Sequence, residues 1–377
     1  MERAYLDHNA TTPLSTAARD AMIAAMDQLG NPSSVHSDGR KARQILDVAR
    51  DSVAALMKCK PESVTFTSGA TESNNTVFAH AKAIGWPVFV SATSHASVLD
   101  CASDAKRIPV QPNGVVDLEQ LAKACEGHET PFIVSVEGVN NETGVIQPIT
   151  EIAQIVQAHD GYLHVDAAQV PGKIDIDDIS TWGDVVILSA HKFGGPKGVG
   201  ATVLPGCRLT ALNASIRGGG QERRNRSGTE NLVGIAGMGA AAGNVGERLG
   251  DIARQESLLG QIVARVSATP SAEIAGEASV RAANTLSMMH PSLTSEVALI
   301  RFDLAGVSIS SGSACSSGKV SKSHVLDAMG YPSDLVQSGL RISIGLETLQ
   351  SDVDRFIAVW DSLFDVGTVH QEARAVA

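Results

Sequence analysis

The first segment with residues suited to chemistry is a glycine-rich turn that follows an apolar run. The run Asp184 to Leu188 leads into Ser-Ala-His-Lys-Phe-Gly-Gly-Pro-Lys-Gly at positions 189–198, so Lys192 comes just after a predicted buried strand. A lysine in this place is partly removed from bulk water. Desolvation together with nearby cations lowers its pKa, which a Schiff-base lysine requires. Taken alone, such a motif is more often an exposed lysine in a turn.

A second segment has an acidic residue at the end of an apolar run. Asp166 and Gln169 lie in His-Val-Asp-Ala-Ala-Gln at positions 164–169. A carboxylate at a strand end could face a pyridinium nitrogen and keep it protonated, which makes the ring an electron sink. The alternative is an ordinary strand-terminal aspartate that caps the next turn, and Asp166 by itself favours that alternative.

Small residues begin a predicted helix within Thr-Ser-Gly-Ala-Thr-Glu-Ser-Asn-Asn at positions 67–75. This segment links a strand at 64–66 to a helix that ends near Gly85. Exposed backbone N–H groups at a helix start, together with the helix dipole, can hold a phosphate, and Thr71 adds a hydroxyl. No Gly-Lys-Ser/Thr follows, so this is not a Walker A loop. Read alone, the segment is only a capped helix start.

One cysteine, Cys315, lies in a run of small polar residues, Ser-Ser-Gly-Ser-Ala-Cys-Ser-Ser-Gly, at positions 310–318. Such a thiol is expected to be exposed, and its thiolate would be the attacking form. The alternatives are a chance cysteine in a linker and a small buried hydrophobe, of which burial is the weaker in this Ser/Gly setting. The other cysteines lack this setting and are interpreted as structural: Cys59, Cys101, Cys125 and Cys207.

The elements that would position these residues are strands that alternate with helices. Val- and Ile-rich runs predict buried strands of a largely parallel sheet, at 64–66, 88–90, 132–136, 162–165, 185–188 and 200–204. A helix is predicted from Arg40 to Met57, where apolar residues recur three or four positions apart. A second is predicted from Thr150, as its cap, to about His159. This alternation predicts an α/β fold.

The chain length indicates two domains. A single hydrophobic core rarely supports 377 residues. Near residue 250 the pattern changes to helices mixed with short strands, with helices predicted at 251–267, 295–305, 323–329 and 351–364. We predict a large domain over 14–250 and a smaller α+β domain formed by 1–13 with 251–377, ending in a frayed tail at 367–377.

Bulk composition narrows the classes of function. The net charge of −11 argues against a nucleic-acid binder, although a local pocket can oppose the global charge. No apolar run approaches the roughly 20 residues of a membrane span, and the N-terminus lacks the apolar core of a signal peptide. Five scattered cysteines without a C-x-x-C pair argue against a disulfide framework and against a zinc site. No metal is therefore expected, and a reducing cytoplasm fits best.

Taken together, these segments resemble the cysteine desulfurases of the NifS/IscS kind, fold-type-I pyridoxal-phosphate enzymes within the class-V aminotransferase family. The resemblance runs from positions 5–13 to 340–345, and its most specific pieces are 66–74, 139–144, 189–192, 226–229 and 311–315. It implies a large domain with a mainly parallel sheet flanked by helices, and a smaller α+β C-terminal domain that carries the cysteine loop.

The resemblance also implies a role for each matching residue. Lys192 would carry the cofactor, pyridoxal 5'-phosphate, while Asp166 would pair with its pyridine nitrogen and Gln169 with its ring oxygen. His95 would stack on the ring and help to move protons, although a lone histidine is more often structural. The phosphate would be held by Ala70, Thr71, Ser189, His191 and, across a homodimer interface, Thr229. The substrate carboxylate would bind to Arg341 and to Asn141, which also touches the cofactor; otherwise a strand-end arginine is more often solvated.

The implied reaction takes sulfur from L-cysteine, gives L-alanine and leaves a persulfide on Cys315. A sulfur-acceptor protein, such as an iron–sulfur scaffold, would then remove the sulfur. The residues after Cys315 resemble the long-loop branch that feeds iron–sulfur assembly. The chain stops soon after Phe364, however, where scaffold-docking members often carry a longer tail. Three alternatives stay open: a selenocysteine lyase or a desulfurase for tRNA thiolation, an aminotransferase without an essential cysteine, and a non-catalytic interaction protein of the same fold.

Overall fold

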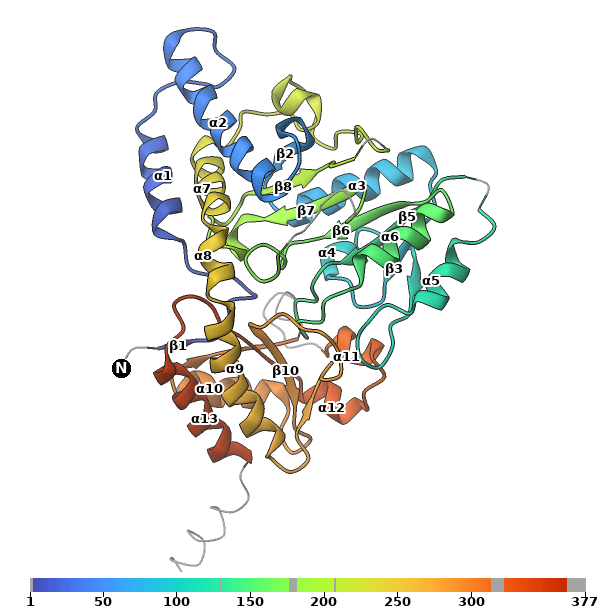
Figure 1. Ribbon diagram of the computed structural model, residues 1–377, viewed down its shortest axis with the longest axis vertical. Coiled ribbons are helices and arrows are strands. Elements are labelled where there is room, and N and C mark those ends of the chain that lie inside the picture. The colour runs from blue at the N-terminus through green and yellow to red at the C-terminus, as the bar shows by residue number, and fades with distance from the viewer. Residues whose placement is uncertain (1–2, 129, 176–181, 207, 313–321, 365–377) are drawn as a thin grey trace, which may run out of the picture.

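A seven-stranded sheet forms the centre of the upper part of the molecule (Figure 1). The computed structural model describes residues 3–128, 130–175, 182–206, 208–312 and 322–364. The strands of this sheet are β2 (Val64–Thr67), β3 (Val88–Ser91), β4 (Lys106–Ile108), β5 (Ile133–Glu137), β6 (Tyr162–Asp166), β7 (Val185–Ser189) and β8 (Gly200–Val203). Their order is β2-β8-β7-β6-β5-β3-β4. Neighbours are parallel except that β8 is antiparallel to β2 and β7, so the sheet is largely parallel, as predicted.

The parallel register aligns the carboxyl ends of the central strands at one edge of the sheet. Glu137 at the end of β5 pairs with Asp166 at the end of β6, and Asp166 pairs with Ile187 of β7. β7 ends two residues later, and the turn with Lys192 follows. Ligands of open α/β sheets bind outside this edge. The register therefore brings Asp166 and the turn with Lys192 to the same place.

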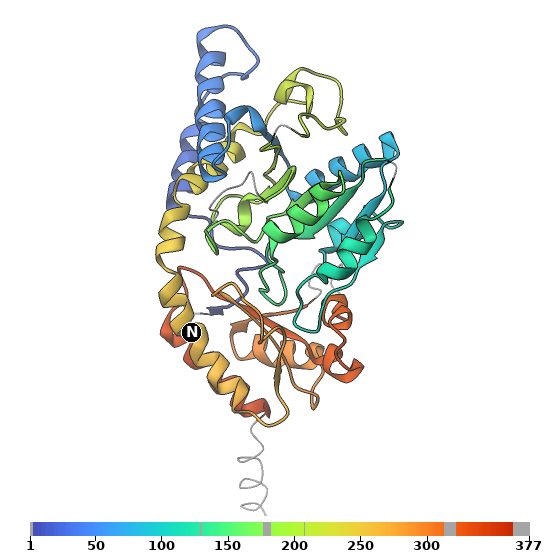
Figure 2. The ribbon, with the colours of Figure 1, turned by 45° about the vertical axis from the view of Figure 1, so that its right-hand side comes forward.

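Helices lie against both faces of this sheet and extend to its side (Figures 1 and 2). They are α1 (Thr16–Met26), α2 (Ser37–Leu56), α3 (Ala70–Ile84), α4 (Ala96–Leu99), α5 (Leu118–Cys125), α6 (Ile149–Ala158), α7 (Leu232–Gly243) and α8 (Val245–Gly250). α7 packs against both α1 and α2. A Cβ on Gly239 of α7 would lie 2.5 Å from the Cα of Ala49, so only glycine allows α2 to approach this closely.

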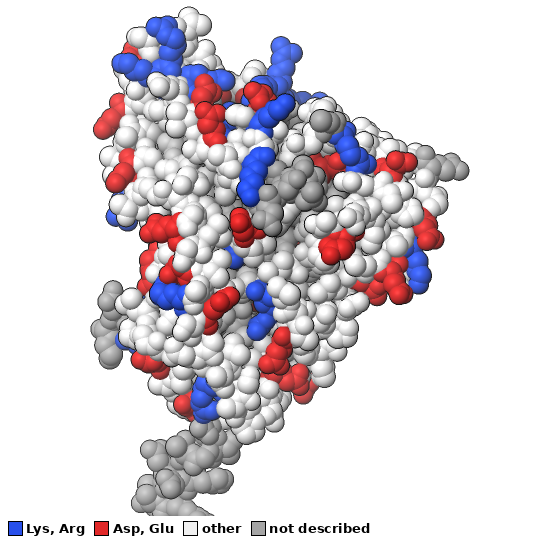
Figure 3. Space-filling view, viewed as in Figure 1, with Lys and Arg blue, Asp and Glu red and all other residues white. Residues whose placement is uncertain are grey.

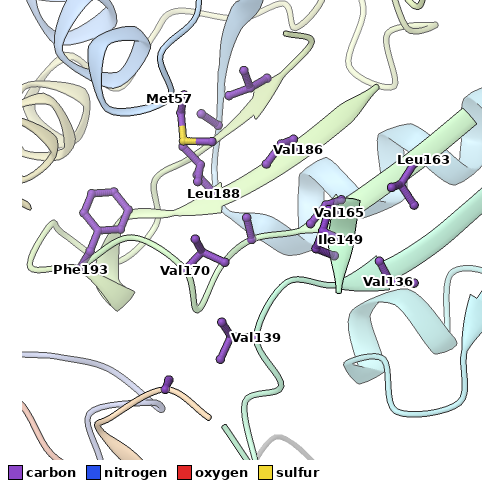
Figure 4. Close-up of a cluster of buried hydrophobic side chains, with 14 of the residues drawn as sticks. Met57, Val136, Val139, Ile149, Leu163, Val165, Val170, Val186, Leu188 and Phe193 are labelled. Carbon is purple, nitrogen blue, oxygen red and sulfur yellow. The ribbon is translucent and has the colours of Figure 1, made fainter. Parts of the chain in front are cut away.

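Alternate side chains of the central strands enter two different apolar cores. Val186 and Leu188 of β7 belong to the cluster shown in Figure 4. Val185 and Ile187 of the same strand pack in a separate cluster with Phe78 of α3. Because successive side chains point to opposite faces, a strand covered on both faces needs a continuous apolar run. This requirement explains why the sequence pattern identified these strands.

Segments from both ends of the chain build the lower part of the molecule. An antiparallel sheet has the order β12 (Ser310–Ser311), β13 (Leu340–Ser343), β10 (Thr285–Met289) and β9 (Glu273–Ile274). β1 (Ala4–Tyr5) pairs in parallel with β11 (Val307–Ser308). The helices of this part are α9 (Ile252–Ser267), α10 (Ser295–Leu304), α11 (His324–Ala328), α12 (Ser333–Ser338) and α13 (Gln350–Phe364).

The lower part has an apolar core of its own. Leu6 packs there with Ile262 of α9 and Trp360 of α13, all of them fully buried. The indole N–H of Trp360 donates to Thr269 Oγ1 at 2.9 Å, so the ring is buried without an unsatisfied donor. Residues of α11 and α12, in contrast, pack with the core of the large sheet. The division into 14–250 and 1–13 with 251–377 stays a prediction.

Most of the predicted helices occur close to the predicted positions, and the differences have local causes. α2 begins at Ser37 rather than near Arg40, because His36 caps it by accepting from Gly39 N–H. The prediction that Thr150 caps the next helix was wrong. Pro148 precedes its first residue, and Thr150 lies inside the helix. Among the described residues, no helix is both long enough and apolar enough to cross a membrane. The predicted tail at 367–377 lies outside the described residues.

Candidate active site

A cavity of about 410 Å³ opens at the carboxyl edge of the large sheet, within the size range of small-molecule sites. Most of the predicted site residues line it: Ala70, Thr71, His95, Asn141, Asp166, Gln169, Ser189, His191, Lys192 and Arg341. Thr229 lies outside this wall, and Cys315 lies outside the described residues. Residues from positions 9 to 341 thus meet in one cavity, which none of the separate motifs could show.

The short 3-10 turn Ala190–Lys192 directs Lys192 toward the N-terminal segment. Its Nζ donates to the carbonyl oxygens of Asn9 at 2.6 Å and of Ala10 at 2.9 Å. Gly195 N–H donates to the carbonyl of Ala190 and closes the turn. The reading of Lys192 as an exposed surface lysine therefore does not hold, because its amine is engaged at the cavity wall.

The carboxylate of Asp166 takes part in a chain of hydrogen bonds that reaches His95. Oδ1 of Asp166 accepts from the N–H of Ala168 at 3.0 Å, which is the turn-capping contact of an ordinary strand end. Oδ2 accepts from Asn74 Nδ2 at 3.2 Å, and the same amide donates to Ser97 Oγ at 3.0 Å. The backbone N–H of Ser97 donates to His95 Nδ1 at 3.1 Å. Asp166 thus caps a turn and lines the cavity at once.

A second lysine, Lys173, fixes the amide of Gln169. The ammonium of Lys173 donates to Gln169 Oε1 and, at 2.6 Å, to Asn9 Oδ1. Nε2 of Gln169 then donates to the carbonyl of Asn9 at 3.0 Å. Burial, reinforced by Lys192, Arg341 and other nearby cations, lowers the pKa of Lys173 well below its usual value.

The beginning of α3 offers backbone donors to the cavity. Gly69 precedes the helix with φ +153° and makes no side-chain cap, so the first N–H groups are not taken by a capping side chain. Gly200 lies so close that a Cβ there would come within 2.7 Å of Gly69 Cα. The N–H groups and the dipole of this 15-residue helix suit an anionic oxygen group.

His191, which lines the same cavity as this helix start, has a ring nitrogen without a hydrogen-bond partner among the described residues. This nitrogen, Nδ1, is buried. Burial, with help from Lys192 and Lys197, lowers the pKa of His191 to about 4, so the ring is neutral at pH 7. A phosphate would satisfy both the helix start and this ring. The residues present therefore fit a phosphorylated pyridine cofactor: an anion site, a carboxylate and a lysine amine surround one cavity.

Arg341 is the residue of the four-stranded sheet that lines the cavity wall. It lies on β13, is 3% exposed, and so is not the solvated strand-end arginine of the alternative interpretation. Its Nη2 donates to Asp7 Oδ1 at 2.7 Å and its Nη1 to the carbonyl of Asn141 at 3.2 Å. Nε has no partner among the described residues. A planar guanidinium with a free donor suits a carboxylate ligand.

Charged side chains of both signs line the cavity of this acidic chain. On the face shown in Figure 3, acidic and basic side chains are interspersed. The wall of the cavity is mixed as well, with the basic Lys192, Lys197 and Arg341 and the acidic Glu72, Glu137 and Asp166. An anionic ligand would therefore be bound by individual cations and by the backbone N–H groups at the start of α3, rather than by a net positive charge of the cavity.

Thr229 and the cysteines are the predicted residues that lie away from the wall of the main cavity or outside the described residues. Thr229 is exposed and lines a neighbouring hollow of about 250 Å³, which shares Ser68 and Gly198 with the main cavity. Burial raises the pKa of the Cys59 and Cys125 thiols to about 11, in agreement with structural roles. Cys207, like Cys315, lies outside the described residues.

Several residues of the site have no predicted role, among them Asn9, Asn74, Ser97 and Lys173. Asn9 belongs to the polar stretch Asp7-His8-Asn9 right after an apolar pair, and Lys173 follows Gln169 by four positions. These local signals are weak. Each of them also has a partner farther away in the chain; Asn9 and Lys192, for example, are 183 positions apart.

Comparisons with known proteins agree with this geometry. The model of the family described as Aminotransferase class-V matches residues 4–356. "Cysteine desulfurase IscS" of Dictyoglomus turgidum is 35% identical over 96% of this chain and 94% of its own length. A solved NifS-like protein from Rickettsia africae has a TM-score of 0.89 at 32% identity, covering 97% of this chain and all of the other. A structure titled "SspA in complex with cysteine" has a TM-score of 0.78 at 27% identity, over 92% and 100% of the two chains. The predicted resemblance and fold class are confirmed.

Proposed function

Because this chain belongs to the aminotransferase class-V family, we propose that it is the pyridoxal-phosphate-dependent cysteine desulfurase its relatives are named for, with Cys315 as the residue that receives the sulfur. One observation carries the proposal. A lysine amine, a strand-end carboxylate, an uncapped helix start and a buried arginine line the same cavity. The substrate would be free L-cysteine and the products L-alanine and a persulfide.

The cofactor of this family, pyridoxal phosphate, supplies an electron sink when it is bound. Lys192 would carry it and Asp166 would face its ring nitrogen. Gln169 would contact the ring oxygen, with its amide oriented by Lys173. His95 and Asn141 would lie against it. Its phosphate would bind to Ala70, Thr71, Ser189, His191 and the Thr229 of a second copy.

The remaining steps belong to residues of this chain. Arg341 and Asn141 would hold the substrate carboxylate and so fix the orientation of the amino acid. The amine of Lys192 would take the proton from Cα and return one later. The thiolate of Cys315 would attack the substrate sulfur, so that a C–S bond breaks and an S–S bond forms. The substrate's Cβ is reduced by two electrons to a methyl group, while the Cys315 sulfur and the transferred sulfur are each oxidised by one, so no external oxidant is needed.

Support for Cys315 comes from the residues that precede it. Gly312, three positions earlier, lines the cavity, so the chain passes the wall just before the cysteine. Serine and glycine around Cys315 also leave a thiol accessible, as a sulfur acceptor must be. An aminotransferase of the same fold would have no use for a cysteine in this place.

The proposal also includes the oligomeric state of the protein and its cellular compartment. It would act as a homodimer, supported by the exposed Thr229 beside the cavity and by exposed apolar side chains on α1 and α2, such as Ile23 and Val48. A reducing cytoplasm fits the cysteines that the structure describes, all of which are free. A sulfur-acceptor protein, such as an iron–sulfur scaffold, would collect the sulfur from Cys315.

A single-turnover assay with L-cysteine and no reductant tests the proposal. We expect one alanine per site and a mass gain of one sulfur on the peptide that contains Cys315. The Cys315→Ala variant should lose both the sulfur adduct and most of the alanine. Alanine formation that survives Cys315→Ala, or a keto acid in place of alanine, would show a different pyridoxal-phosphate reaction.

A further inference from the structure

Glu142 is buried in contact with two residues, Gly312 and Ser323, that flank the segment with Cys315 in the sequence. This glutamate follows Asn141 in the loop after β5 and is 2% exposed. Its Oε2 accepts the hydroxyl of Ser323 at 2.5 Å. Gly312 lies beside the same oxygen and beside Ser323: a Cβ on Gly312 would come within 2.2 Å of this Oε2 and within 2.8 Å of Ser323 Cβ. The three residues are thus packed in mutual contact.

Gly312 and Ser323 lie on either side of residues 313–321 in the sequence, and Cys315 is one of these residues. Both described flanks of this segment meet at one carboxylate from the large sheet. Ser323 also connects Glu142 to α11, because its Oγ accepts from Leu326 N–H at 3.1 Å and so caps this helix. The next residue, His324, is hydrogen-bonded through Nε2 to the carbonyl of Ser94 at 2.9 Å, directly before His95.

We propose that Glu142 is a positioning residue for sulfur transfer: it anchors both flanks of the Cys315 segment to the loop that carries Asn141. The inference rests on the proposed function, since it presupposes that Cys315 receives the sulfur. Glu142 is not among the described residues that line the cavity, so it acts through the flanks rather than on the substrate. Because transfer rates depend steeply on the placement of reacting atoms, loosening the flanks slows the step that uses Cys315.

The surroundings of Glu142 do not suggest a purely stabilising role. Burial raises the pKa of Glu142, while the Ser323 hydroxyl, His324, Arg341 and His95 act in the opposite direction. Removing a carboxyl group from water is unfavourable, and apolar side chains of similar size often stabilise such positions as well or better. A buried carboxylate that touches Gly312 and Ser323 is better explained by the geometry it enforces.

The test separates the steps before sulfur transfer from the transfer itself. Glu142→Ala and Ser323→Ala are compared with the unaltered holoenzyme in single turnovers. One readout is the change in cofactor absorbance on addition of L-cysteine, which does not require Cys315. The other is the rate at which sulfur appears on the Cys315 peptide. Ser338→Ala is the matched control, because Ser338 is also buried and hydrogen-bonded, to Leu335 and His290, but away from Glu142.

We expect both test variants to slow sulfur arrival on Cys315 by about 10- to 100-fold, with the half-saturating cysteine concentration for the absorbance change within about twofold of the unaltered value. Glu142→Gln and Ser323→Thr keep an acceptor and a hydroxyl and should restore the rate. The double alanine variant should be no slower than the slower single variant, because both remove one contact. Gly312→Ala should slow the same step by pushing the flanks apart.

Other results would overturn the inference. Unchanged sulfur arrival in Glu142→Ala and Ser323→Ala would do so. A parallel loss of cofactor binding, absorbance change and sulfur transfer would do so too, because it would mark a general structural defect. Absence of sulfur on Cys315 in the unaltered protein is a distinct result, which would refute the proposed function and the inference with it.

Discussion

The guanidinium of Arg341 donates to the carboxylate of Asp7 at 2.7 Å, so the arginine proposed to bind the substrate is itself held by an acid. Both side chains are largely buried, at 4% and 16% exposure. Asp7 also accepts from Ser310 Oγ at 2.8 Å, which connects it to β12. A substrate carboxylate that approaches Arg341 therefore meets a guanidinium whose charge is already partly compensated.

The first prediction concerns this compensation. Asp7→Asn keeps an acceptor oxygen for Arg341 but removes the negative charge, so the substrate carboxylate no longer competes with a like charge. We expect the half-saturating L-cysteine concentration to fall by about threefold, which corresponds to roughly 0.7 kcal/mol of charge interaction. Steady-state kinetics measure it, with Asp303→Asn, in an exposed pair with Arg3, as the control. A rise in half-saturation would show that Asp7 orients Arg341 more than it offsets its charge.

A second prediction identifies the lysine that carries the cofactor. Lys192 and Lys173 both donate to Asn9, through its carbonyl and its side chain respectively, so two amines lie near the same point. Reduction of the holoenzyme with borohydride followed by peptide mapping should place the cofactor mass on Lys192. Lys192→Ala should lower turnover by more than about 100-fold, whereas the exposed Lys41→Ala should not. Cofactor found on Lys173 instead would reverse the two roles.

The parts of this fold that could be predicted are those with a local cause. Buried strands such as β7 require continuous apolar runs, and the glycine-rich turn with Lys192 follows directly from one of them. Helix ends were less predictable because capping depends on single contacts, as at His36 and Pro148. Asp166 could be placed at a strand end, but not in a cavity, until the register with β5 and β7 was known.

The supporting residues could not be predicted, because their partners are distant in the chain. Asn9 meets Lys192 only after β1 and the small sheet pack beside the turn that follows β7. Glu142 was visible only as part of a short motif, and its contact with Ser323 spans 181 positions. In both cases tertiary packing decides which polar groups meet, and no periodicity of the sequence encodes it.

A third prediction concerns stability against pH. His8 is 3% exposed and bonded to Thr12 Oγ1 at 2.9 Å, and burial, with Arg248 and Lys173, lowers its pKa to about 3. Between pH 6.5 and about 3 the unfolded chain therefore binds a proton at this site that the folded chain does not. The stability contributed by neutral His8 is complete above pH 6.5 and is lost as the pH falls through this window, by up to about 1.4 kcal/mol per pH unit.

Denaturant unfolding at a series of pH values measures this slope. His8→Gln should flatten the dependence between pH 6 and 4, roughly the part of the window where the folded protein survives. The exposed His36→Gln should leave the slope unchanged even if it lowers the overall stability through its capping bond. An identical slope in His8→Gln and the unaltered protein would show that other groups dominate the acid response.

The last prediction concerns the buried ion pair of Arg50 and Glu222. Nη2 of Arg50 donates to Oε1 at 2.7 Å and Nη1 to Oε2 at 2.8 Å, and Phe66 N–H donates to Oε2 at 2.9 Å. Both side chains are almost fully buried. Glu222→Gln leaves Arg50 as an uncompensated buried charge, so the free energy of unfolding should fall by about 3–5 kcal/mol. The exposed pair Arg43 and Asp47 is the control, where Asp47→Asn should cost less than about 1 kcal/mol.

A double variant separates two contributions to the free energy of unfolding: the attraction within the ion pair and the cost of leaving one buried charge unpaired. Arg50→Met with Glu222→Leu removes both charges at similar volume, and it should destabilise the protein less than Glu222→Gln alone. Glu222 also lines the hollow that contains Thr229 and adopts a left-handed backbone at φ +46°. If the double variant is as unstable as the single one, the lost contacts of Glu222 with Arg50 and Phe66, rather than an unpaired charge, set the cost. The ion pair would then hold the segment beside Thr229 in place.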